Sequence, residues 1–182
     1  GSLRFGRDWR LASSTREGLL LTPGTDGPPV VTPTRQADGA FTRSFKLRQV
    51  SAAGCGACEA DLNVLGTIVF DLPRFGMDYT ASPRHADALV ITGTVPRNMH
   101  DALMKADRAI AKPRAVIAVG ACAISGGVFA PRGGEPSAQR NFGASAHLEV
   151  DLFIPGCVPH PYTILDGLLR FLGRKTPAPG EE

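Results

Sequence analysis

Short apolar runs alternate with amphipathic segments of helical length from Phe45 onward. Four runs have the length and composition of strands: residues 45–50, 88–91, 115–119 and 152–154. Strands that alternate with helices along a chain are typical of a parallel sheet covered by helices. The pattern therefore predicts an α/β domain over residues 45–173, with a parallel sheet flanked by helices.

Three segments have the spacing of amphipathic helices. The first is predicted over residues 59–70, and the last over residues 162–172, where Gly173 stops it. The middle helix begins at Val95-Pro96-Arg97 with the proline near its first turn. Its apolar face is formed by residues at helical spacing, namely Met99, Leu103, Ala106 and Ile110.

The first 44 residues have a different character. They show little periodicity and are rich in turn-forming residues, as in the segment 22–29. Their apolar residues are too sparse for a separate core and too numerous for a solvated linker. We expect residues 1–44 to form an extended arm that packs on a partner protein, with a disordered tail as the alternative. Residues 174–182 are expected to form a C-terminal tail.

Composition narrows the classes of function. The 182 residues are 43% hydrophobic and 20% charged, as in soluble globular proteins. The net charge of +3 is small, and the scattered Lys and Arg residues argue against a nucleic-acid partner. No stretch approaches the roughly 20 apolar residues of a membrane-spanning helix, and the N-terminus does not resemble a secretory signal. We therefore expect a cytoplasmic protein, in which cysteines serve as metal ligands or catalytic thiols more often than as disulfides.

The four cysteines share one position relative to the predicted strands. Each lies in a glycine-containing loop just after a strand: Cys55 and Cys58 after the first, Cys122 after the third and Cys157 after the last. The carboxyl ends of parallel strands lie along one edge of a sheet, so distant cysteines can converge there. Glycines beside them let the backbone approach a bulky group closely. The sequence therefore predicts one site built from four thiols.

Three chemistries use thiols in this way. A structural zinc site usually takes two C-x2-C pairs, whereas here one pair is followed by two lone cysteines. A thiol-disulfide oxidoreductase needs only Cys55 and Cys58, between a strand and a helix N-terminus, and leaves Cys122 and Cys157 without a role. A four-iron cluster uses every cysteine and accepts ligands that are far apart in sequence. The residues alone leave all three open.

Five segments carry a resemblance to a known family. They are Cys55-Gly56-Ala57-Cys58-Glu59-Ala60-Asp61, residues 84–93, Arg97-Asn98-Met99, residues 117–123 and residues 155–161. In this order they resemble the small subunit of membrane-bound group 4 [NiFe]-hydrogenases, which is similar to the 20 kDa subunit of respiratory complex I. The resemblance spans about residues 45–173 and does not cover the N-terminal arm.

The resemblance implies a flavodoxin-like α/β domain that holds one [4Fe–4S] cluster beside the active site of a large catalytic subunit. The implied ligands are Cys55, Cys58, Cys122 and Cys157. Electrons would pass between the large subunit and a ferredoxin-like iron–sulfur subunit, and the complex would attach to the cell membrane through its other subunits.

Three details bear on the branch of the family. The cysteines of the first pair are adjacent in complex I, whereas Cys55 and Cys58 have the two-residue spacing of the hydrogenases. Ala121 and Val158 replace an acidic residue and a proline that are common in the family. These departures leave room for a related complex whose large subunit has lost nickel.

Two carboxylates follow Cys58 where a helix is predicted to begin, and the dipole of a helix favours negative charge there. Asp61 matches a carboxylate found in both branches, which implies that it couples proton movement to the cluster, with helix capping as the alternative. Glu59 is a second candidate of the same kind. His85, His100 and His147 show no pattern.

Overall fold

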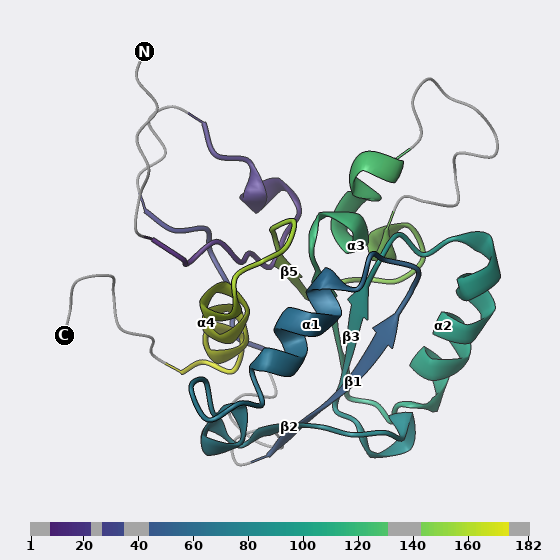
Figure 1. Ribbon diagram of the computed structural model, residues 1–182, viewed down its shortest axis with the longest axis horizontal. Helices are drawn as coiled ribbons and strands as arrows, with labels where there is room; N and C mark the ends of the chain where they lie inside the picture. The colour runs from purple at the N-terminus through teal and green to yellow at the C-terminus, as the bar shows by residue number, and fades with distance from the viewer. Residues whose placement is uncertain (1–7, 23–26, 35–43, 131–142, 175–182) are drawn as a thin grey trace.

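A five-stranded parallel sheet forms the centre of the molecule in the computed structural model, which describes residues 8–22, 27–34, 44–130 and 143–174 (Figure 1). The strands are β1 (Phe45–Ser51), β2 (Met77–Tyr79), β3 (Ala88–Thr92), β4 (Ala115–Val119) and β5 (Leu152–Ile154). Their order is β2-β1-β3-β4-β5, and every neighbouring pair is parallel. This is the order of flavodoxin-like sheets, so the predicted fold class is confirmed.

Helices cover both faces of the sheet (Figure 1). The α-helices are α1 (Ala57–Val64), α2 (Arg97–Ala109), α3 (Ala121–Ser125) and α4 (Pro161–Phe171). Single 3-10 turns are η1 (Glu17–Leu19), η2 (Leu72–Phe75), η3 (Pro83–His85), η4 (Gly127–Phe129) and η6 (Ala144–Ala146). Helices α1 and α4 contribute to one hydrophobic core, and α2 and α3 to the other. None of the helices in the described ranges is both long and apolar enough to span a membrane.

The central strands are buried on both faces. All residues of β3 and β4 are buried, and alternate residues enter different cores. Val90 and Ile117 pack in the core beneath α1 and α4, whereas Leu89 and Ile91 pack in the core beneath α2. Two-sided burial explains why these strands are continuous apolar runs in the sequence.

The first helix differs from its prediction. Helix α1 spans Ala57–Val64, two residues earlier at its start and six earlier at its end than residues 59–70. Gly56 precedes it with φ +87°, a conformation that favours glycine. Gly66 and the β-branched residues after it disfavour a longer helix, and Ile68 and Val69 are 94% and 74% exposed. Their apolar character therefore does not indicate a buried helix face.

The described part of the arm packs on the domain itself. Ser13 and Phe153 exchange two backbone hydrogen bonds of 3.0 and 2.8 Å, so the arm pairs with the edge strand β5. Ala12 is fully buried against α4, where a Cβ on Gly167 would lie only 2.8 Å from the Cβ of Ala12. The role of the arm in binding a partner stays a prediction. Residues 1–7, 23–26 and 35–43 of the arm, and residues 175–182 of the tail, lie outside the described residues.

Arg170 of α4 joins the arm to the domain. Its guanidinium donates to Asp166 at 2.8 Å and to the carbonyl oxygens of Pro29 at 2.9 Å and Ala12 at 3.4 Å. The Asp166 side chain is only 2% exposed. This buried ion pair therefore contributes to the folded state and also positions the arm.

We expect Arg170→Ala to lower the free energy of unfolding by about 3–5 kcal/mol, because it removes the guanidinium that offsets the charge of the buried Asp166 carboxylate. Urea denaturation of the full chain measures the change. Arg108→Ala is the control, because Arg108 is exposed on α2. Equal midpoints for the two variants would show that the Arg170 ion pair contributes little.

Candidate functional site

All four cysteines line one cavity of about 140 Å³ at the carboxyl edge of the sheet. The loop after β1 contributes Cys55, and the loop after β5 contributes Cys157. Cys58 and Cys122 were expected in loops as well, but they lie in the first turns of α1 and α3. The loop after β3 completes the wall with Gly93. The structure thus brings together the four thiols that the sequence singled out, while their role as ligands stays a prediction.

Glycine allows two of these loops to approach each other closely. Gly120, between β4 and α3, has φ +87°. A Cβ at this position would lie 2.5 Å from the Sγ atom of Cys58, closer than any ordinary contact. A larger residue would therefore push Cys58 away from the segment that carries Cys122. The close approach of the two cysteine loops requires glycine here.

Burial and the neighbouring charges favour the protonated thiol at Cys58 and Cys122. Burial raises the pKa of Cys58 to about 12, and the charges of Glu59 and the other three cysteines add to the shift. Burial also raises the pKa of Cys122, with further contributions from Cys157 and Cys55. Four thiolates at this place therefore need a positively charged group to offset their repulsion. A bound metal centre deprotonates its thiol ligands in this way.

The cavity suits a group of several atoms. Within the described ranges, no three His, Cys, Asp or Glu side chains are placed so that they could hold a single metal ion. The cysteines instead surround a space, with Cys55 and Cys157 exposed and Cys58 and Cys122 partly buried. Four sulfur donors around such a space fit an iron–sulfur cluster, which is commonly held by four cysteine thiolates.

The two candidate carboxylates occupy different places. Glu59 lines the cavity, and its Oε1 atom accepts hydrogen bonds of 2.6 Å from Ser51 and from Thr92. Burial by itself would raise the pKa of Glu59, but these hydrogen bonds outweigh it and hold the pKa below its ordinary value. Asp61 lies further along α1, partly exposed, and is not among the residues that line the cavity.

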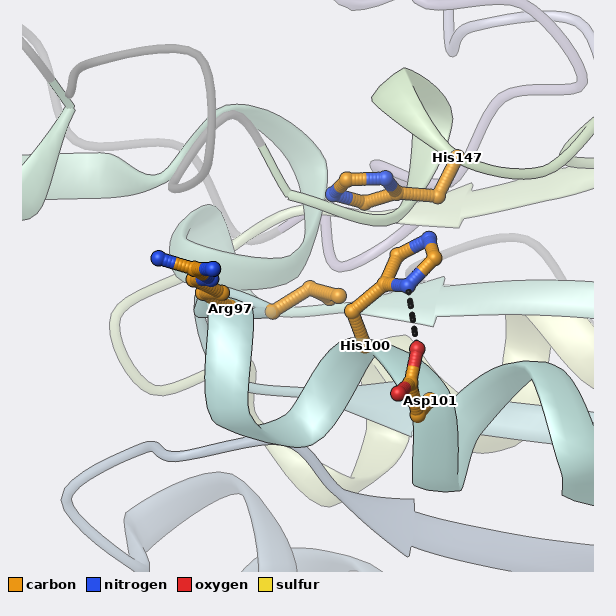
Figure 2. Close-up of a pocket in the computed structure, with 5 residues that line it drawn as sticks. Arg97, His100, Asp101 and His147 are labelled. Carbon is orange, nitrogen blue, oxygen red and sulfur yellow. Dashed lines mark hydrogen bonds and ion pairs between the residues drawn. The ribbon is translucent and has the colours of Figure 1, made fainter.

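A second cavity of about 450 Å³ was not expected from the sequence. Arg97, His100 and Asp101 of α2 and His147 after η6 line it (Figure 2). The imidazole rings of His100 and His147 meet edge to face with centroids 4.9 Å apart, and Nδ1 of His100 lies 3.2 Å from Asp101. These histidines come from distant segments without a common motif, so only the fold reveals the pair.

His147 is held in its neutral form. Burial lowers its pKa below the ordinary 6.5, and the nearby His100 adds to the shift. Its Nε2 atom is buried and has no hydrogen-bond partner in the part of the chain that the structure describes. A proton on this nitrogen would therefore be poorly stabilised in the folded state.

We expect acid to destabilise the wild type more than His147→Phe. Because the folded-state pKa of His147 is lowered, the unfolded chain binds a proton that the folded chain does not. The stability contribution is complete above the unfolded value near 6.5 and is lost as the pH falls from there toward the lowered folded pKa.

Thermal unfolding between about pH 7.5 and 5.5 tests this expectation. The phenylalanine variant keeps a ring against His100 and should lose less stability on acidification. His85→Phe, at an exposed position in η3, is the control and should follow the wild type. The same pH dependence in all three proteins would contradict the interpretation.

Comparison with known protein families gives a match over residues 55–171, to the family described as NADH ubiquinone oxidoreductase, 20 Kd subunit. An NADH-quinone oxidoreductase subunit of Citrifermentans bemidjiense is 38% identical over 117 residues, which are 64% of this chain and 65% of that protein. The corresponding subunit of Carboxydothermus hydrogenoformans is 38% identical over 127 residues, 69% of this chain and 73% of that protein. The match thus spans slightly less than two thirds of the Citrifermentans protein.

Solved structures give a similar picture. A chain of the membrane-bound sulfane sulfur reductase, an archaeal respiratory membrane complex, superposes with a TM-score of 0.57 and 27% identity. The alignment covers 72% of this chain and 70% of that one. A chain of an NAD+-reducing [NiFe]-hydrogenase superposes with a TM-score of 0.56 over 76% of this chain and 97% of that chain. Its identity of 23% supports a common fold only.

Proposed function

Because the chain belongs to the family of the 20 kDa subunit of NADH:ubiquinone oxidoreductase, we propose that it is an electron-transfer subunit of an oxidoreductase complex. In this role it binds one [4Fe–4S] cluster through Cys55, Cys58, Cys122 and Cys157. The observation that carries the proposal is the single cavity that all four cysteines line.

When bound, such a cluster accepts and donates one electron at a time. The chain would supply four thiolates for it, from the loops after β1 and β5 and from the first turns of α1 and α3. Gly120 keeps Cys58 and the Cys122 segment close together, and partial burial of both cysteines limits the access of water. Burial, charge and hydrogen bonds around the sulfur atoms set the potential at which the electron is held.

The complex proposed around this chain contains a large subunit of the hydrogenase or complex I type and a ferredoxin-like iron–sulfur subunit. The large subunit would cover the open side of the cavity, where Cys55 and Cys157 are exposed. The chain itself would be cytoplasmic and would attach to the membrane through other subunits. The two-residue spacing of Cys55 and Cys58 favours the hydrogenase branch, while Ala121 and Val158 are compatible with a large subunit that has lost nickel.

The alternatives account for fewer observations. A thiol-disulfide oxidoreductase would use Cys55 and Cys58 only, although Cys122 and Cys157 line the same cavity. A zinc-stabilised interaction module usually takes two C-x2-C pairs, whereas this chain has one such pair and two lone cysteines.

Iron and acid-labile sulfide content, with low-temperature EPR on the anaerobically purified complex, test the proposal. We expect a cluster signal from this subunit that is lost or altered in Cys122→Ser, because one of its four thiolates is removed. Circular dichroism provides the control that the variant has folded. An intact complex with zinc or no metal on this chain would contradict cluster binding, and a dithiol enzyme would keep its activity in Cys122→Ser.

Asp61 is proposed to couple proton movement to the cluster. We expect Asp61→Asn to fold and to turn over more slowly, because asparagine has nearly the size of aspartate but cannot take up or release a proton. Turnover of the complex and the cluster content of Asp61→Asn and Asp61→Ala are compared. Normal turnover of Asp61→Asn would contradict the proton role. Helix capping, the alternative expected from the sequence, does not apply, because Asp61 is inside α1 and the residue that precedes the helix is Gly56.

A further inference from the structure

We propose that Glu59 is a positioning residue. It fixes the start of α1, and with it Cys58, against the ends of β1 and β3, and it places its negative charge beside the group that the cysteines hold. The part of this inference that concerns the charge rests on the proposed function. The part that concerns position rests on the chain alone.

One oxygen atom of Glu59 joins three elements. Its Oε1 accepts a hydrogen bond from Ser51, the last residue of β1, and another from Thr92, the last residue of β3, both at 2.6 Å. Thr92 is fully buried. Glu59 itself lies in the first turn of α1, next to Cys58. The start of α1 is therefore fixed to two strand ends by a single carboxylate.

The backbone around this carboxylate leaves little freedom for the turn. Ala52 donates to the carbonyl oxygen of Thr92 at 2.8 Å and accepts from Val95 at 3.0 Å, which extends the pairing of β1 and β3 beyond the strands. A Cβ on Gly93 would lie 2.4 Å from the carbonyl oxygen of Ala52. The loops after β1 and β3 are thus in backbone contact with each other. Glu59 adds a second connection between them, from the first turn of α1.

Among the described residues, the second carboxylate oxygen of Glu59 accepts no hydrogen bond that would help to fix α1 to the strands. Oε2 of Glu59 is buried and has no hydrogen-bond partner within the described part of the chain. A buried oxygen atom without a partner costs free energy, and the two hydroxyl bonds need only the other oxygen. The geometry therefore does not explain why a charged side chain occupies this place. A negative charge on the cavity wall would, however, oppose the addition of an electron to a group bound there.

Two substitutions separate position from charge. Glu59→Gln keeps an oxygen that can accept from Ser51 and Thr92 but removes the charge, so we expect it to retain the cluster and to raise its midpoint potential. Glu59→Ala removes both, so we expect cluster loss during anaerobic dialysis to be about tenfold faster. Redox titration followed by EPR measures the first effect on the purified complex, and iron content against time measures the second.

Glu149 provides the matched control. It is an exposed glutamate ahead of β5, at the opposite edge of the sheet. Glu149→Gln and Glu149→Ala should leave both the potential and the rate of cluster loss at their wild-type values. An unchanged potential in Glu59→Gln, or wild-type cluster retention in Glu59→Ala, would overturn the inference.

A third measurement does not depend on a cluster. In the cluster-free full chain, modification of Cys58 by a maleimide, followed by peptide mass spectrometry, reports how firmly the turn is held. Both Glu59 variants remove a charge that raises the pKa of Cys58, so both should react faster than the wild type. We expect Glu59→Ala to react faster than Glu59→Gln, because only alanine also removes the hydrogen bonds to Ser51 and Thr92. Equal reaction rates in both variants would overturn the positioning role, whereas a wild-type complex without any cluster would overturn the proposed function and the role of the charge.

Discussion

The site depends on one constraint, which is that all five strands run in the same direction. Parallel strands end at a common edge, so the loops after β1, β3, β4 and β5 meet there although they are distant in sequence. Each cysteine loop begins within a few residues of its strand. The thiols are therefore located by the hydrogen-bonded ladder of the sheet, and no long loop has to order itself around them.

The two cavities at this edge share a structural element. Gly93 lines the cysteine cavity, and Val95, two residues later, lines the histidine cavity. Both residues have positive φ angles, of 83° and 55°, and the second is unusual for a β-branched side chain. The short connection between β3 and α2 thus forms a wall of each cavity. A change of backbone conformation in this connection would alter both sites at once.

Much of the fold was predictable because strands that are buried on both faces are continuous apolar runs in the sequence. The bounds of β4 and β5 agree with their runs, and the cysteines were recognisable from their positions after strands. Strand β2 was missed because it has three residues and only Met77 is buried. The contact between His100 and His147 was missed because it is purely tertiary. The end of α1 was wrong because apolar residues predict burial, whereas Ile68 and Val69 face solvent.

The arm was predictable in character but not in place. Its apolar residues led to the prediction that it packs on a partner protein, which stays a prediction. Nothing in their order indicated the contacts of Ala12 and Ser13 with α4 and β5 of the same chain. The pairing of Ser13 with Phe153 covers part of the free edge of the sheet. An unpaired edge strand is a template for strands of other molecules, and Ser13 occupies that template on β5. The family match begins at Cys55, beyond the arm. The arm therefore covers part of the free edge of β5, which disfavours pairing of this strand with a strand of another molecule.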